Sequence, residues 1–545
     1  MSFCRARSRG VFSTLGSARQ MSSFLFRFSL FVGSMLFAYS ANAEQASRDM
    51  LLIANTGEPL TLDPHRYNLR LEETLLNDLF MGLTTFNAAG EIVPGAAARW
   101  EASEDGMVWT FYLKPELRWS DGTPLTADDF VFAFRRLQNP ETAASLAYFM
   151  NMLANAEAIN SGQMPPEKLG VRAIDSTTLR LTLQRPYPFL LERLLYPTAF
   201  PVPRHAIEKH GDDWVKAEHW VSNGAYTLQA WVPQAYIELQ ANPLFIEPVS
   251  IQQARYLPVA SEQAAYNRYR NGELHVIPSF PVGELNALRD NPDLRLSSLL
   301  SMFYLVFNTR EAPFDDVRVR QALSLAVNQE ILTDKVMRSG NQPEYTFAPS
   351  AIADYTGNSL PHRDLPPKER ISRAKTLLQL AGFGPDNPLQ LTLRHPAGLE
   401  IKKVNLAIGG MWKAIGVQAS LQQADLRSHF ADLRSGSFQV GWAGWIGENN
   451  AEHYLGLLKS DIGNVNYGGF ANPVFDALFR QAQQQSDATE RNALLASAEE
   501  VATHLYPVVP LYSSTVRRLV TPRLQGWKEN GRDMHQLRYL SWSEE

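Results

Sequence analysis

The chain has 545 residues, of which 45% are hydrophobic and 20% charged, a balance typical of folded globular proteins. This length is several times that of a typical domain, so we expect more than one lobe. A net charge of −5 and a pI near 6.2 argue against a nucleic-acid-binding protein, which needs a basic face. A single cysteine, Cys4, excludes an intramolecular disulfide.

The first 43 residues have a composition of their own. They contain five arginines and no acidic residue, then a short apolar run over Phe28–Tyr39, and end in Ala41-Asn42-Ala43. This order predicts a secretory signal peptide cleaved after Ala43, with Met1 or Met21 as the start. A membrane anchor or a buried N-terminal helix is the alternative, although the apolar run is short for a membrane span. Cleavage would leave 502 residues with a net charge of −10 and no cysteine, which suits an oxidising compartment.

Strand-like and helix-like segments alternate along the first half of the chain. Met50–Asn55 is a short apolar run that predicts a buried strand, and apolar residues at helical spacing predict a helix over Glu72–Leu83. Thr126 with Asp129 three residues later forms a capping box, so a helix is expected to begin there. Alternation of strand-forming residues predicts further strands at Val108–Leu113 and Leu179–Leu183, and a turn entering a strand at Ser222–Leu228.

The second half continues the alternation. A helix is expected from about Val317 to Val336, after Pro313-Phe-Asp-Asp. Further helices are predicted at Ile371–Ala381, Lys402–Ala414, Leu426–Arg434, Pro473–Gln485 and Ala488–Leu505. Further strands are predicted at Phe303–Asn308, Leu389–Leu393, Val417–Leu421 and Val508–Tyr512. This order predicts the α/β class, in which short crossings join the lobes.

The usual catalytic motifs of hydrolases, P-loop enzymes and zinc proteins do not occur in the sequence. Ser372-Arg-Ala-Lys375 matches the S-x-x-K pattern of a serine nucleophile, but the companion motifs S-D-N and K-T-G are missing, so the polar face of a helix is the simpler interpretation. His205 and His210 lie five residues apart and share a helix face poorly, and Asp121 lies in a segment that lacks the acids of a calcium loop. We therefore predict a binding protein without metal or cofactor rather than an enzyme.

One segment combines residues suited to ligand binding. Residues 441–450 read GWAGWIGENN, with two tryptophans, three glycines and one acid. Glycines allow a ligand to approach the backbone closely, and tryptophan offers a flat apolar wall. Glu448 is suited to bind a cation such as an α-ammonium group. The same pattern also fits a glycine-rich strand end with buried tryptophans and a solvated glutamate.

From Asp63 to the C-terminus the sequence resembles the periplasmic oligopeptide-binding proteins of ABC importers, which are solute-binding proteins of family 5. The resemblance is carried by long collinear stretches: LDPH (62–65), DLFMGL (78–83), VWTF (108–111), WSDGTPLTADDFVFAFRRL (119–137), FPVPRHAIEKHGDDW (200–214), SNGAYTL (222–228), NRYRNGEL (267–274), APFDDVRVRQALSLAV (312–327), LLQLAGF (377–383) and AGW (443–445).

The resemblance implies a three-lobed periplasmic binding protein of the type II, cluster C-like class, with the ligand buried between two large lobes that close by a hinge. After the signal peptide at 1–43, the expected lobes are lobe I (44–86, 198–305 and 516–545), lobe II (87–197) and lobe III (306–515).

In this family an acid just after the AGW motif binds the amino terminus of the peptide, and strand backbone pairs with the ligand main chain. That acid aligns with Glu448, where the family usually has aspartate, and the following Asn449-Asn450-Ala451-Glu452 also departs from the family pattern. The family's cationic partners for the peptide carboxylate align with Trp442, Glu311 and Ile401 and are therefore lost, and a family tyrosine aligns with Leu146. Arg427 and Arg434 are candidate substitutes for these cations, although surface charge is the simpler interpretation. The expected ligand-binding residues are Glu448, Trp445, Gly444, Ile446, Trp442, Asn449 and Arg434.

The leading hypothesis is a monomeric periplasmic protein that captures oligopeptides and delivers them to the membrane permease of an ABC importer, with no nucleic-acid partner. Within this class, a murein-derived peptide, a dipeptide, haem or a nickel chelate is the alternative ligand. An exported hydrolase that uses Ser372 and Lys375 is a remote alternative from a different class.

Overall fold

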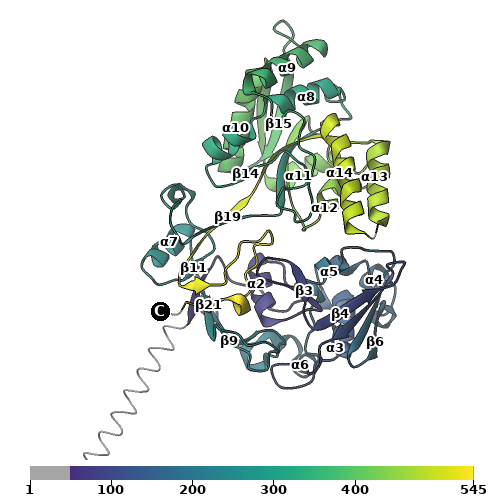
Figure 1. Ribbon diagram of the computed structural model, residues 1–545, viewed down its shortest axis with the longest axis vertical. Coiled ribbons are helices and arrows are strands. Elements are labelled where there is room, and N and C mark those ends of the chain that lie inside the picture. The colour runs from purple at the N-terminus through teal and green to yellow at the C-terminus, as the bar shows by residue number, and fades with distance from the viewer. Residues whose placement is uncertain (1–49, 486, 544–545) are drawn as a thin grey trace, which may run out of the picture. The chain divides into compact units, whose positions relative to one another are not determined.

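The computed structural model describes residues 50–485 and 487–543, and it has the mixed α/β composition predicted from the sequence (Figure 1). The predicted signal peptide and its cleavage site lie outside the described residues. Within the described ranges, no helix combines the length and apolar character that a membrane span requires.

A seven-stranded sheet is assembled from three separate stretches of the chain. Its order is β12-β19-β11-β1-β10-β9-β8; β1 is parallel to β11, whereas the pairs β12–β19, β19–β11, β10–β9 and β9–β8 are antiparallel. The strands are β1 (Leu51–Asn55), β8 (Tyr226–Val232), β9 (Tyr236–Ala241), β10 (Gln253–Pro258), β11 (Val276–Ile277), β12 (Leu294–Ser298) and β19 (Thr515–Val520). The chain therefore leaves this sheet and returns to it twice. Helix α7 (Glu262–Arg270) connects β10 to β11.

A four-stranded antiparallel sheet lies between the first and second visits to the large sheet. Its order is β4-β5-β7-β6, and its strands are β4 (Ala97–Ala102), β5 (Val108–Leu113), β6 (Val171–Asp175) and β7 (Thr178–Thr182). Helix α3 (Ala127–Gln138) contacts β6 and β7. The predicted capping box at its start is confirmed, since the backbone N–H of Thr126 donates to Asp129 Oδ2 at 2.8 Å.

Short elements complete this half of the chain. The helices are α2 (Arg70–Leu79), α4 (Ala156–Asn160), α5 (Leu190–Arg193) and α6 (Arg204–His210). Two small antiparallel pairs are formed by β2 (Thr84–Phe86) with β3 (Ile92–Pro94) and by β20 (Leu524–Gln525) with β21 (Ser541–Trp542). The predicted helix over 72–83 ends earlier, at Leu79, because Phe80 adopts an extended conformation.

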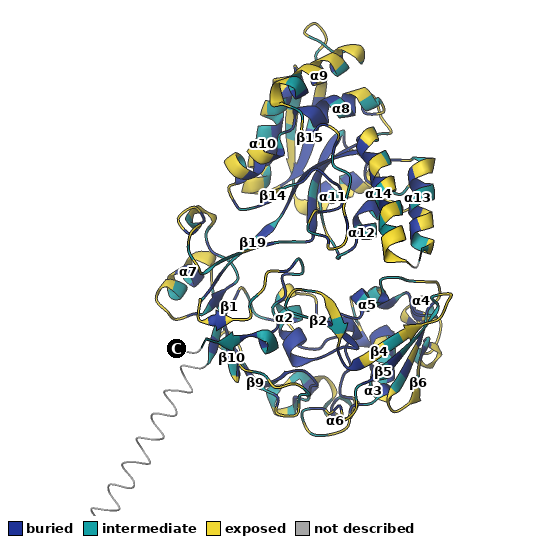
Figure 2. Cartoon of the chain, viewed as in Figure 1, coloured by how far each residue is buried: buried dark blue, intermediate teal, exposed yellow. Residues whose placement is uncertain are grey.

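A six-stranded mixed sheet organises the second half of the chain. Its order is β14-β18-β13-β17-β15-β16, and its strands are β13 (Ser301–Phe307), β14 (Gln342–Pro343), β15 (Gln390–Pro396), β16 (Gln418–Ala424), β17 (Val440–Ile446) and β18 (Val508–Ser513). The accompanying helices are α8 (Val317–Ala326), α9 (Pro367–Leu380), α10 (Leu399–Lys413), α11 (Leu426–Ser435), α12 (Glu452–Leu455), α13 (Pro473–Gln484) and α14 (Ala488–Leu505). Helices α9, α10, α13 and α14 each have an exposed side, whereas the central strands β13, β17 and β18 are largely buried (Figure 2).

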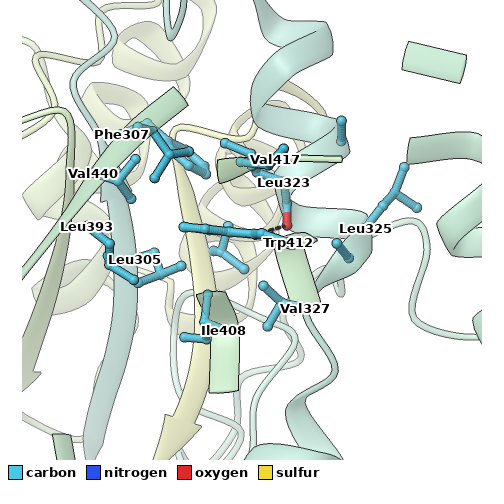
Figure 3. Close-up of a cluster of buried hydrophobic side chains, with 14 of the residues drawn as sticks. Leu305, Phe307, Leu323, Leu325, Val327, Leu393, Ile408, Trp412, Val417 and Val440 are labelled. Atoms are coloured by element: carbon cyan, nitrogen blue, oxygen red, sulfur yellow. Dashed lines mark hydrogen bonds between the residues drawn. The ribbon is translucent and has the colours of Figure 1, made fainter. Parts of the chain in front are cut away.

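One hydrophobic cluster packs between this sheet and its helices, and Trp412 of α10 lies inside it (Figure 3). The indole Nε1 of Trp412 donates a hydrogen bond of 3.0 Å to the Leu323 carbonyl on α8. A buried indole N–H needs such a partner, so this bond fixes how α10 packs against α8.

The prediction of one helix over Val317–Val336 is wrong. Helix α8 ends at Ala326 because Val327 is extended, and a π-helical turn then runs over Ile331–Met337. The side chain of Asn328 accepts the backbone N–H of Ile331 at 2.8 Å, which starts the second segment separately. The other predicted elements are found within a few residues of their predicted bounds. The bounds of the three lobes stay a prediction.

Candidate functional site

Strand β17 carries the two tryptophans of the glycine-rich segment on opposite faces of the six-stranded sheet, because side chains alternate along a strand. Trp442 is buried and stacks on the ring of Phe303, with 5.2 Å between centroids. A Cβ at Gly444 would lie 2.4 Å from the same Phe303 ring, so a glycine is required there by packing. Trp442 and Gly444 thus shape the sheet, and neither lines the cavity described below.

Glu448 follows the end of β17 and is buried in an ion pair with Arg193 of α5. Glu448 Oε1 lies 2.6 Å from Arg193 Nη1, and the two side chains are 5% and 18% exposed. Burial raises the pKa of Glu448 to about 7, while the positive charge of Arg193 opposes that rise. The carboxylate predicted to bind a cation therefore holds one supplied by the protein itself.

A second ion pair and two backbone hydrogen bonds hold this region in place. The backbone N–H of Asn449 donates to Glu192 Oε1 at 2.9 Å, and Glu192 in turn lies 2.7 Å from the guanidinium of Arg532. The backbone N–H of Glu448 donates to Nδ1 of His453 at 3.0 Å. Burial lowers the pKa of His453 to about 4, so His453 is neutral near pH 7 and accepts this bond.

Glu448 and Arg193 line a cavity of roughly 300 Å³. Aromatic side chains contribute much of its wall: Tyr187, Phe189, Trp445 and Phe479. The polar or charged lining residues are Arg193, Glu448, Asn450, Glu452, His453, Lys459 and Gln483. An apolar wall with a few convergent polar groups is the usual composition of a small-ligand site.

Two polar atoms of this cavity have no hydrogen-bond partner within the described ranges. The first is Oε2 of Glu452, whose other oxygen accepts from Gln483 Nε2 at 2.8 Å. The second is the indole Nε1 of Trp445. A buried polar atom without a partner is costly, so both atoms are suited to bind groups of a ligand.

The structure brings together only part of the predicted set. Glu448 and Trp445 line the cavity, and Asn449 is fixed beside it through its backbone. Ile446 is 69% exposed, and Arg434 is an exposed residue of α11 that is not part of the cavity wall.

Sequence reasoning missed the role of Arg193 and of His453. No local signal identifies Arg193 as the partner of Glu448, because the two residues are 255 positions apart. Glu452 was recognisable only as a departure from the family pattern.

The residues of the catalytic and metal sites considered from the sequence do not form such sites in the described part of the chain. Ser372 and Lys375 are exposed on α9, and among the interactions of the described residues none joins their side chains. His205 pairs with Asp121 at 2.8 Å, and His210 stacks on His219 at 3.8 Å. Residues 50–485 and 487–543 contain no group of three His, Cys, Asp or Glu side chains arranged to hold a metal ion.

Comparison with known proteins places this site in a family context. The periplasmic murein peptide-binding protein MppA of Escherichia coli (strain K12) is 33% identical over 512 residues, which cover 92% of this chain and 95% of that protein. The periplasmic oligopeptide-binding protein OppA of Salmonella typhimurium is 35% identical over 500 residues, covering 89% and 91%. The solved unliganded open form of MppA superposes with a TM-score of 0.86 at 33% identity, covering 91% of this chain and 98% of that one.

The family described as bacterial extracellular solute-binding proteins, family 5 middle, matches residues 91–464. That range includes the four-stranded sheet, most of the six-stranded sheet and both partners of the buried ion pair. Together with relatives that are more than 30% identical over nearly the whole chain, this match confirms the resemblance inferred from the sequence motifs. The chain belongs to the family 5 bacterial extracellular solute-binding proteins.

Proposed function

We propose that this protein captures peptides in the periplasm and delivers them to the permease of an ABC importer, without a catalytic step of its own. Relatives described as periplasmic binding proteins for oligopeptides and for murein peptides support this proposal. The protein is proposed to act as a monomer, after cleavage behind Ala43, with no nucleic-acid partner.

The observation that carries the proposal is the buried carboxylate of Glu448, which holds a cation at 2.6 Å on the wall of a cavity. The guanidinium of Arg193 occupies the place in which a peptide ammonium group would make a charge-assisted hydrogen bond. In the proposed complex the ligand ammonium replaces Arg193 against Glu448. Asn449, Trp445 and Ile446 are proposed to lie along the ligand backbone, while Arg434 stays a weaker candidate for its carboxylate.

The first test is native mass spectrometry of the mature protein purified without denaturation. A spread of added masses that fragment as peptides would support an oligopeptide carrier. One discrete mass with a diamino-acid or amino-sugar fragment would instead indicate a cell-wall peptide. Bound molecules without amide bonds would contradict the proposal.

The second test measures peptide affinity by isothermal titration calorimetry with wild type and Glu448→Gln. A charge-assisted hydrogen bond contributes about 1.5–3 kcal/mol, so the variant should bind free-amine peptides roughly 10–100-fold more weakly. The N-acetylated form of each peptide is the matched control, because it has no ammonium group and should lose little affinity in the variant. An unchanged affinity for free-amine peptides would refute this role of Glu448.

A further inference from the structure

The cavity beside Glu448 is also lined by the carboxyl group of Glu452, whose burial and hydrogen bonding are unusual for a glutamate. Glu452 is the first residue of α12, and it stands in the segment where this chain departs from the family pattern. Burial raises the pKa of Glu452, and the amide of Gln483 and nearby positive charges oppose that rise. Its Oε1 accepts from Gln483, whereas its Oε2 is buried and has no hydrogen-bond partner in the described part of the chain.

The other charges on the cavity wall are already paired. Glu448 and Arg193 neutralise each other at 2.6 Å. The ammonium group of Lys459 lies 3.0 Å from Asp461 and 5.4 Å from the centre of the Phe479 ring. Among the charged groups of the described residues that line this cavity, Glu452 is the one without an ion-pair partner.

Aromatic rings surround the same space. Tyr187, Phe189, Trp445 and Phe479 line the cavity together with Glu452. The face of an aromatic ring attracts a cation, and the attraction strengthens where water is excluded. A carboxylate with a free oxygen, enclosed by aromatic walls, matches the side chain of lysine or arginine, whose aliphatic stem packs on the rings while its charged end reaches the acid.

We propose that Glu452 is a specificity-determining residue that binds a basic side chain of the peptide ligand close to its amino terminus. The inference rests on the proposed peptide-binding function. It adds a preference for peptides with a basic side chain, which Glu448 alone would not give. The free indole N–H of Trp445 is a donor in the same cavity, and it suits a carbonyl group of the same ligand.

The test compares two tripeptides by isothermal titration calorimetry. Lys-Ala-Ala and norleucine-Ala-Ala share a free amino terminus and an unbranched aliphatic side chain, but only the first carries a second charge. Wild type should bind Lys-Ala-Ala at least tenfold more tightly. Glu452→Gln, which keeps the acceptor for Gln483, should bind the two peptides within about twofold of each other.

Two further variants separate charge from structure. Glu500→Gln removes the same charge from an exposed position of α14 and should leave the preference unchanged. Glu452→Asp keeps the negative charge and should retain much of the preference, which a purely structural role for Glu452 would not explain.

The outcomes distinguish this inference from the proposed function. Equal binding of the two peptides by wild type, or a lysine preference that survives Glu452→Gln, would overturn the role of Glu452 and leave peptide binding intact. Failure of both peptides and of the peptides tested above to bind would overturn the proposed function and this inference together.

Discussion

Replacing Arg193 by glutamine should lower the free energy of unfolding by an amount that grows as the pH rises above 7, whereas the loss caused by replacing Glu448 should change little between pH 7.0 and 8.5. Because burial raises the pKa of Glu448 to about 7, its neutral and ionised forms are almost equally stable in the folded protein at pH 7. When Arg193 is removed, Glu448 stays protonated. The part of the loss that depends on the charge of Glu448 is then less than about 1 kcal/mol at pH 7.

The sign of the pH dependence follows from the raised pKa. The ordinary pKa of a glutamate is near 4.5, and that of Glu448 in the folded protein is about 7. Between these two pH values Glu448 ionises in the unfolded chain but not in the folded one, so the free energy of unfolding of the wild type falls as the pH rises. Above pH 7 the folded wild type ionises too and the penalty levels off. Without Arg193 the carboxyl group stays neutral, so the penalty continues to grow by about 1.4 kcal/mol for each pH unit.

The reverse substitution, Glu448→Gln, leaves a guanidinium that cannot lose its proton. Removing one partner of a buried ion pair costs about 3–5 kcal/mol. Arg193 is 18% exposed and its Nε also donates to the Tyr187 hydroxyl at 3.1 Å, which favours the lower end of that range. Between pH 7.0 and 8.5 this cost should change by less than about 1 kcal/mol, since the wild-type penalty levels off above pH 7 and neither arginine nor glutamine titrates there.

The assay is urea unfolding followed by tryptophan fluorescence at pH 7.0 and 8.5. Arg373→Gln is the control, because Arg373 pairs with Glu369 on the exposed face of α9 and should contribute less than about 1 kcal/mol at either pH. If the cost of Arg193→Gln were the same at both values of pH, or if the two site variants were equally destabilised at pH 7.0, the reasoning would be refuted.

Three further predictions concern the core, a helix cap and the pH dependence of binding. Trp412→Phe should lower the free energy of unfolding by about 2–3 kcal/mol in urea titrations, because it opens a cavity and leaves the buried Leu323 carbonyl without its donor. Thr126→Ala should cost about 1 kcal/mol in the same measurement by removing the side chain of a capping box, and Thr126→Ser should restore most of it. Calorimetry of a free-amine peptide should show affinity rising about tenfold from pH 5.5 to 7, as Glu448 ionises, and Glu448→Gln should abolish the rise.

Local patterns predicted the secondary structure well where a physical signal marks the element's ends. Helix α14 has the predicted bounds, 488–505, because Asp487 accepts the backbone N–H of Glu490 at its start and Tyr506 adopts a left-handed conformation at its end. The break between α8 and the π-helical turn was missed because the apolar spacing continues through it. Asn328, whose side chain starts the second segment, was the available signal.

The candidate site was predictable only in part, since it is built from distant segments. The acid after β17 could be identified from the motif, whereas its partner Arg193 lies on a short helix far earlier in the sequence. Alternation along the strand already implied that Trp442 and Trp445 face opposite sides, so the two could not line one cavity together. The orphan oxygen of Glu452 depends on which neighbours pack around it, and no sequence pattern reports that.

The pairing of Glu448 with Arg193 also bears on the cations that the sequence comparison found missing. The resemblance of the sequence motifs implies that the family positions for the peptide carboxylate fall on Trp442, Glu311 and Ile401, and none of these side chains is a cation. If a ligand ammonium group binds Glu448 in place of Arg193, Arg193 loses its ion-pair partner while it still lines the cavity. A buried guanidinium without an anion is strongly disfavoured. A ligand that has both an ammonium group and a nearby carboxylate or carbonyl can pair with Glu448 through the first and with Arg193 through the second. If a ligand replaces Arg193 against Glu448 as proposed, a ligand with an ammonium group but no carboxylate or carbonyl near Arg193 should therefore bind more weakly than one that has both.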